Sequence, residues 1–134
     1  MSQTNRITNN ALGVIIGLVV SVWWIFMGLD LGFPFVAGDK VSYILTIGEH
    51  RHTIMTIAAL ILIPICAKEY APGFLGAIIL AIITFALCLA HVTYMLLAAP
   101  SGFESQLFGP VVWAIIQIPI ILFSYRARRE LSTA

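Results

Sequence analysis

The sequence predicts an all-α integral membrane protein, an antiparallel four-helix transmembrane bundle with both termini in the cytoplasm. Hydrophobic residues make up 60% of the 134 residues and charged residues only 10%, and the mean hydropathy is +1.01. Soluble domains are typically about 25% charged, so this composition indicates that lipid solvates most of the chain. The charges gather in short clusters between long apolar stretches. We therefore expect a multi-pass protein of the cell membrane or another energy-transducing membrane.

The first two spans are predicted at residues 11–31 and 48–67. A spanning helix needs about 20 mostly apolar residues, because each residue rises about 1.5 Å across roughly 30 Å of hydrocarbon. The first span is uncharged until Asp30. The start of the second span is harder to define, because the polar residues 49–52 interrupt the apolar sequence. We place it by counting back from Lys68.

The third and fourth spans are predicted at residues 73–98 and 107–125. His91 is the ionisable residue inside the third span, and Pro119 lies inside the fourth. A basic group ends the fourth span and consists of Arg126, Arg128 and Arg129. Together with the first two spans, these make a single membrane domain over residues 1–134, with no separate soluble domain.

The distribution of basic residues predicts the orientation. Four crossings place both termini and the second loop on one side, which holds Arg6, Lys68, Arg126, Arg128 and Arg129. The other side holds Lys40 and Arg51. Because Lys and Arg concentrate in cytoplasmic loops, both termini are expected inside. The loops are short, so neighbouring helices are expected to pack antiparallel.

Small residues at helical spacing occur in two spans and predict close helix packing. They are Gly13, Gly17 and Ser21 in the first span and Gly73, Ala77 and Ala81 in the third. Two interpretations stay open. The small residues pack helices together within one protomer, or they bring two copies of the chain together.

Most ionisable residues outside the cytoplasmic clusters lie at or near the opposite, outer boundary of the membrane. They are Asp30, Asp39, Glu49, His50, His52, His91 and Glu104. Helical spacing predicts three polar stripes, because residues three and four apart share a face. The stripes are Trp23, Met27 and Asp30; Glu49, His52, Thr53 and Thr56; and Thr84, Cys88, His91 and Met95. If these stripes turn inward, they meet in the outer half of the bundle.

Ionisable side chains within a membrane are costly and by default mark pathways, relays or ligand sites. We predict a ligand-binding or proton-handling site from Asp30, Glu49, His50, His52 and His91. Imidazoles of His52 and His91 with a carboxylate from Glu49 or Asp30 suit zinc, iron or copper, and Cys88 and Met95 favour copper. Alternatively, His52 and His91 hold a haem between them. The simpler interpretations are an interhelical hydrogen bond for His91 and a hydrated helix end for residues 49–52.

The predicted function is that of a non-catalytic membrane subunit, in a homo-oligomer or with other membrane subunits, holding a metal, a haem or a lipophilic ligand in the outer leaflet. One alternative is an oligomeric transporter or channel for protons or small cations. Another is a small membrane redox protein that depends on a metal or haem. The net charge of +1 offers no basic field for nucleic acid, and the chain contains no hydrolase or nucleotide-binding motif.

Overall fold

The computed structural model describes the backbone of residues 2–30, 39–98 and 107–133, and side chains at 2–25, 52, 54–97 and 107–133. Within these residues the chain forms four α-helices. They are α1 (Gln3–Asp30), α2 (Asp39–Ala67), α3 (Ala71–Ala98) and α4 (Phe108–Ser132). The predicted all-α fold is therefore confirmed.

Three of these helices are long and apolar enough to cross a membrane. The qualifying segments are Gln3–Ile25, Ala71–Leu97 and Phe108–Ser132. Within the described part of α2, the apolar segment Ile54–Ala67 is shorter. At about 1.5 Å per residue, each of the three long segments exceeds the roughly 30 Å of a hydrocarbon core. These are the dimensions of a membrane protein.

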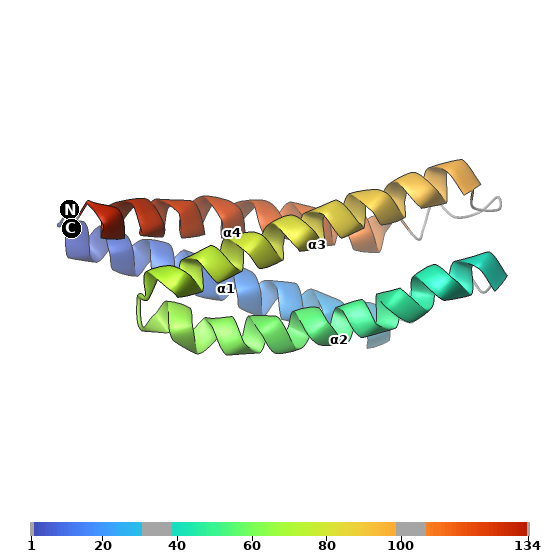
Figure 1. The fold of residues 1–134 in the computed structure, drawn as a ribbon, viewed down its shortest axis with the longest axis horizontal. Coiled ribbons are helices and arrows are strands. Elements are labelled where there is room, and N and C mark those ends of the chain that lie inside the picture. The colour runs from blue at the N-terminus through green and yellow to red at the C-terminus, as the bar shows by residue number, and fades with distance from the viewer. Residues whose placement is uncertain (1, 31–38, 99–106, 134) are drawn as a thin grey trace.

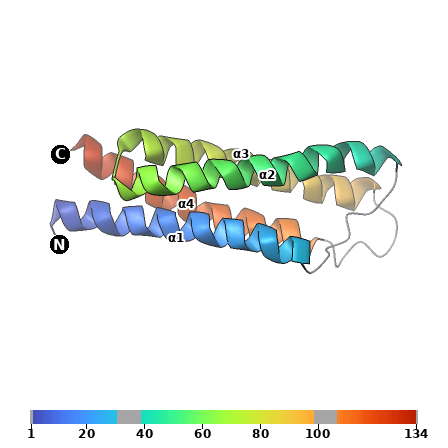
Figure 2. The ribbon, with the colours of Figure 1, turned by 90° about the horizontal axis from the view of Figure 1, so that it is seen from below.

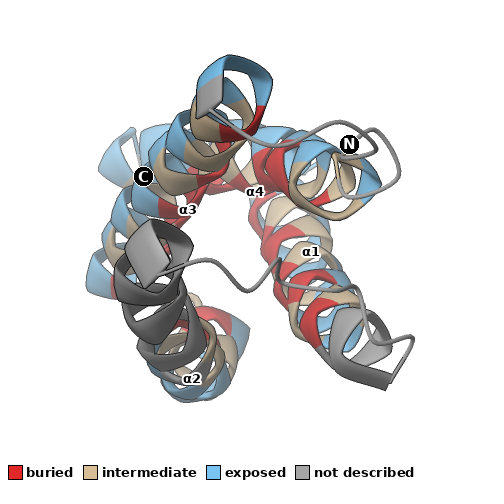
Figure 3. Cartoon of the chain, turned by 90° about the vertical axis from the view of Figure 1, so that its right-hand side faces the viewer, coloured by how far each residue is buried: buried red, intermediate tan, exposed pale blue. Residues whose placement is uncertain are grey.

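The four helices lie side by side and alternate in direction (Figures 1 and 2). Both termini and the short turn between α2 and α3 are at one end of the bundle, which we call the terminal end; the opposite end is the far end. Viewed along the bundle, α4 lies between α1 and α3, and α2 lies across from α4 (Figure 3). The most extensive packing joins α4 to α3 and to α1.

The half of the core nearest the terminal end is tightly packed with apolar side chains. Val14, Leu18, Phe74 and Ile120 are each at most 2% exposed. Outward-facing residues of the same helices are also apolar, and Ile16, Leu60, Ile79 and Ile115 are among the large side chains that are half exposed. An apolar surface around an apolar core is expected where the surrounding solvent is lipid.

The predicted small-residue stripes pack the helices of one chain against each other. A Cβ on Gly17 would lie 2.5 Å from Ile120 Cγ1, and one on Gly13 would lie 2.7 Å from Phe123 Cγ. On the other side of the bundle, a Cβ on Gly73 would lie 2.7 Å from Ile65 Cγ2. Real Cβ atoms do not approach this closely, so the glycines permit the contacts of α1 with α4 and of α3 with α2. These contacts agree with the interpretation of packing within one protomer.

Candidate functional site

His52 reaches from α2 across the bundle to α4. Its ring lies edge-on to the ring of Trp113, with centroids 5.2 Å apart and an interplanar angle of 65°. His52 is half-buried and Trp113 is only 4% exposed. One turn further along α2, Met55 is also buried, so His52 and Met55 belong to the inward face of this helix.

Ser21, Trp113 and Gln117 form a hydrogen-bonded polar cluster, which we call the Ser21 cluster. The Ser21 hydroxyl accepts hydrogen bonds from Trp113 Nε1 at 2.8 Å and from Gln117 Nε2 at 3.2 Å. Gln117 Nε2 also donates to the Trp113 carbonyl oxygen at 2.9 Å. All three side chains are buried, so the cluster ties α1 to α4 and fixes the indole against which His52 packs.

Aromatic residues close to the end of a membrane span are often interfacial, and Phe108, Trp113 and Tyr125 lie close to the ends of the predicted fourth span. For Trp113 an interfacial position is wrong. Tyr125 and Phe108 are about 60% exposed, but Trp113 is in the core. The signal that identifies it is helical spacing. The buried residues of α4 include Trp113, Gln117, Ile120, Ser124 and Ala127, which follow each other at intervals of four and three residues.

The predicted stripe on α3 faces the interior. Thr84, Cys88 and Met95 are each at most 4% exposed, and His91 is half-buried. The Thr84 hydroxyl donates to the Leu80 carbonyl oxygen at 2.8 Å and contacts Met55 Sδ at 3.3 Å. The polar side chain of Thr84 is thereby satisfied by its own helix, as is usual for threonine in an apolar helix.

The stripe predicted on α1 does not face inward at Trp23, which is 54% exposed. The inward face is instead formed by Ser21 and Ile25, which are buried. Trp24 is half-buried and donates from Nε1 to the Gly109 carbonyl oxygen at 3.0 Å. The interior therefore meets a face of α1 that is rotated away from the predicted one.

Three of the predicted site residues, Asp30, Glu49 and His50, belong to α1 and α2, but their side chains lie outside the described residues. Their convergence with His52 and His91 stays a prediction. Among the side chains that the structure describes, no three from His, Cys, Asp and Glu form a group that could hold a metal ion. A metal site that includes Glu49 or Asp30 is therefore not tested.

Cys88 belongs to the second apolar cluster of the core. It is fully buried, and the cluster also contains Ile25, Met55, Trp113 and Ala114. Neither Cys66 nor Cys88 forms a disulfide. A buried thiol among apolar groups behaves as a small hydrophobic side chain, so the packing of Cys88 is explained without a metal.

The polar interior near His52 does not continue to the terminal end. Between the Ser21 cluster and that end, Val14, Leu18, Phe74 and Ile120 fill the core. Among the described residues closer to that end than Gln117, Ser124 is the one buried polar side chain, and its hydroxyl has no described hydrogen-bond partner. The described interior is thus apolar towards the terminal end, whereas its far half combines the second apolar cluster with the Ser21 cluster and the half-buried His52 and His91.

No protein-family model matches this chain. No curated protein and no solved structure matches it either.

Proposed function

We propose that this protein is a non-catalytic subunit that crosses the membrane four times and works within the membrane plane. It binds a metal, a haem or a small lipophilic ligand in the outer half of the bundle, around His52 and His91. It does so as a homo-oligomer or together with other membrane subunits. The nearly all-apolar exposed surface of the helices supports a role inside the bilayer.

The four crossings are supported by the full length of α2. Its 29 residues are enough to cross about 30 Å of hydrocarbon, although the apolar segment Ile54–Ala67 covers only part of it. The charge distribution supports the orientation. The terminal end carries Arg6, Lys68, Arg126, Arg128 and Arg129, so this end belongs in the cytoplasm and the far end faces outward.

The observation that carries the proposal is the asymmetry along the bundle axis. Two half-buried histidines, His52 and His91, lie towards the far end, and packed apolar residues fill the half nearest the terminal end. A polar region that ends on a closed apolar base suits a ligand that enters and leaves by the same side. A ligand-binding function therefore fits this interior better than passage through the protomer.

The transport alternative needs a polar path to the cytoplasmic side. Ser21, Thr84 and Gln117 reach mid-bundle, but their polar groups already form hydrogen bonds to other parts of the core. Below them, Leu18 and Phe74 are at most 2% exposed. A proton or cation path would therefore have to form between protomers. We rank transport after the ligand-binding subunit, and a small metal- or haem-dependent redox protein after transport.

The test is metal content by mass spectrometry together with an absorption spectrum on gently purified protein. Wild type is compared with His52→Ala and His91→Ala. We expect a metal near one equivalent per site, or a Soret band, in wild type and its loss in both variants, because each removes one imidazole ligand. Tyr70→Ala is the control, because it removes an exposed ring from the turn between α2 and α3, at the end of the bundle away from both histidines.

Absence of any cofactor from wild type contradicts the metal and haem forms of the proposal. Proton or cation flux in proteoliposomes that is lost in His52→Ala and His91→Ala would then establish the transport alternative instead. Chemical crosslinking in native membranes tests the association separately. A chain that stays monomeric and captures no other subunit contradicts the proposed role as a subunit.

A further inference from the structure

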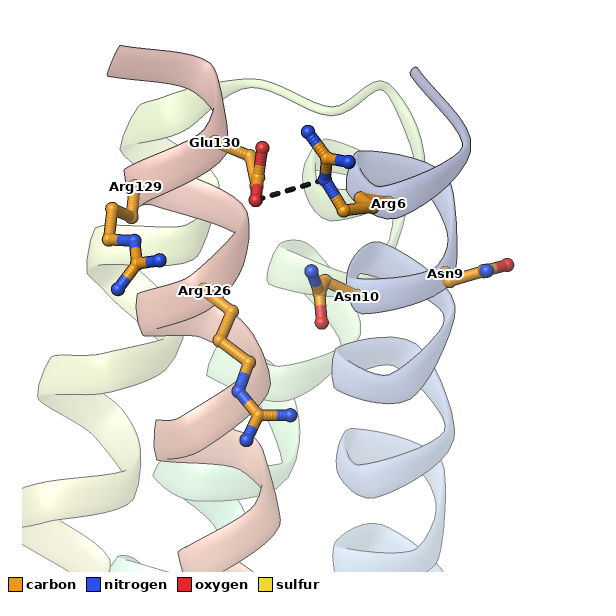
Figure 4. Close-up of a pocket in the computed structure, with 6 residues that line it drawn as sticks. All are labelled: Arg6, Asn9, Asn10, Arg126, Arg129 and Glu130. Atoms are coloured by element: carbon orange, nitrogen blue, oxygen red, sulfur yellow. Dashed lines mark hydrogen bonds and ion pairs between the residues drawn. The ribbon is translucent and has the colours of Figure 1, made fainter. Parts of the chain in front are cut away.

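A second feature lies at the terminal end, far from the histidines. A cavity of about 490 Å³ opens between α1 and α4 and is lined by Arg6, Asn9, Asn10, Arg126, Arg129 and Glu130 (Figure 4). Pockets that bind small molecules typically measure about 300–1,000 Å³, so this cavity has room for a ligand group. All six lining side chains are polar or charged, in a chain of which only 10% is charged.

The lining carries an excess of positive charge. Three arginines face one glutamate, and the glutamate is already engaged, with Arg6 Nε 3.2 Å from Glu130 Oε1. Gln3 Nε2 donates to the Glu130 backbone oxygen at 2.8 Å and further joins the two helix ends. Arg126 and Arg129 form no ion pair with any described acidic residue. The cavity therefore has positive charge left over to bind an anion.

Arg126 and Asn10 face each other across the cavity. Figure 4 shows the Arg126 guanidinium extending from α4 towards α1, below the pair of Arg6 and Glu130, and the Asn10 carboxamide extending from α1 towards α4. Arg129 points away from α1 in the same view. A guanidinium offers a planar fork of N–H donors that matches two oxygens of a phosphate, and a carboxamide adds a further donor.

We propose that this cavity binds a phosphate group, carried by the headgroup of an anionic phospholipid. The cavity lies where the apolar surface of the bundle ends. On α4 the exposed side chains change from Ile118 and Leu122 to Tyr125 and then Arg126, and on α1 Leu12 and Ile16 are exposed just beyond Asn10. A phosphate held at Arg126 thus leaves acyl chains free to lie along exposed apolar helix. The proposal rests on insertion in a bilayer but not on the histidine site.

The test is native mass spectrometry of the purified full chain in detergent, titrated with phosphatidylglycerol or phosphatidylcholine at about 0.15 M salt, where general surface attraction is screened beyond about 8 Å. The key variant is Arg126→Gln. Its matched control is Arg128→Gln, which removes the same charge from an exposed position on the same helix outside the cavity. Arg126→Lys keeps the charge but removes the guanidinium fork.

We expect phosphatidylglycerol to bind wild type at least about tenfold more tightly than phosphatidylcholine, because the choline cation beside the phosphate of phosphatidylcholine is repelled by the arginines of the cavity. Arg126→Gln should lose about tenfold in affinity, Arg126→Lys about threefold, and Arg128→Gln less than twofold, because only the first two alter the site. Equal losses in Arg126→Gln and Arg128→Gln overturn the proposal, because they show attraction to the whole basic end. Inorganic phosphate is added to the complex with phosphatidylglycerol at a concentration equal to that of the lipid. If it displaces the lipid, the lipid assignment is overturned in favour of a soluble phosphate compound.

Discussion

Gly17→Leu is expected to push α1 away from α4 and to destabilise the bundle by about 3 kcal/mol, the upper end for overpacking a close contact. A Cβ at this position would lie 2.5 Å from Ile120 Cγ1. Ile120 is fully buried, so its Cγ1 atom has no space into which to move. The helices must separate or the side chain must stay strained. The measurement is the midpoint of unfolding in sodium dodecyl sulfate, followed by tryptophan fluorescence.

Val19→Leu is the matched control for this variant. Val19 lies on the same helix and is 50% exposed, so a leucine there faces the surroundings of the bundle rather than α4. Its effect should stay within about 0.5 kcal/mol, as for most surface substitutions. Equal unfolding midpoints for Gly17→Leu and wild type would show that α1 and α4 do not pack through Gly17.

The sequence was sufficient to predict the helices but not their ends. The apolar stretches at 11–31 and 48–67 correspond to helices that begin earlier, at Gln3 and at Asp39. Hydropathy reports which residues are compatible with hydrocarbon, whereas a helix continues as long as its backbone hydrogen bonds form. Both helices therefore begin in polar sequence ahead of the apolar part that hydropathy detects.

The inward faces were predicted only in part, and the reason is physical. A helix in lipid is apolar on every side, so hydropathy does not distinguish the face that meets other helices from the face that meets lipid. Polar residues were the better guide, since the α3 stripe through Thr84, Cys88 and Met95 is indeed buried. The predicted α1 stripe begins at Trp23, which is exposed. The prediction is wrong at this residue because an indole is amphipathic and also suits the boundary between apolar and polar surroundings.

The contact between His52 and Trp113 could not be predicted from the sequence. His52 was a predicted site residue, but its contact with Trp113 joins helices that are not neighbours in the chain. The indole N–H group of buried Trp113 donates its hydrogen bond to Ser21 on α1. Helical spacing on α4 could indicate that Trp113 shares a face with Gln117, but only the three-dimensional arrangement brings Ser21 to both.

Ser21→Ala is expected to destabilise the bundle by about 1–2 kcal/mol, because two buried N–H donors then lose their shared acceptor. Trp113 Nε1 loses its bond to Ser21, and Gln117 Nε2 keeps only its bond to the Trp113 carbonyl oxygen. Trp113→Phe removes one of these donors. In the double variant, the cost should therefore be less than the sum of the single costs when unfolding is measured in sodium dodecyl sulfate.

Ser124→Ala is the matched control, because it deletes a hydroxyl of the same kind from the same interior. Ser124 is fully buried, and its oxygen has no described partner, so its removal takes away no described hydrogen bond and lessens the cost of burying a polar group. We expect unchanged or slightly greater stability. Equal losses in Ser21→Ala and Ser124→Ala would mean that each serine contributes through packing alone. A loss confined to Ser21→Ala means that its hydrogen bonds hold the indole in place against His52.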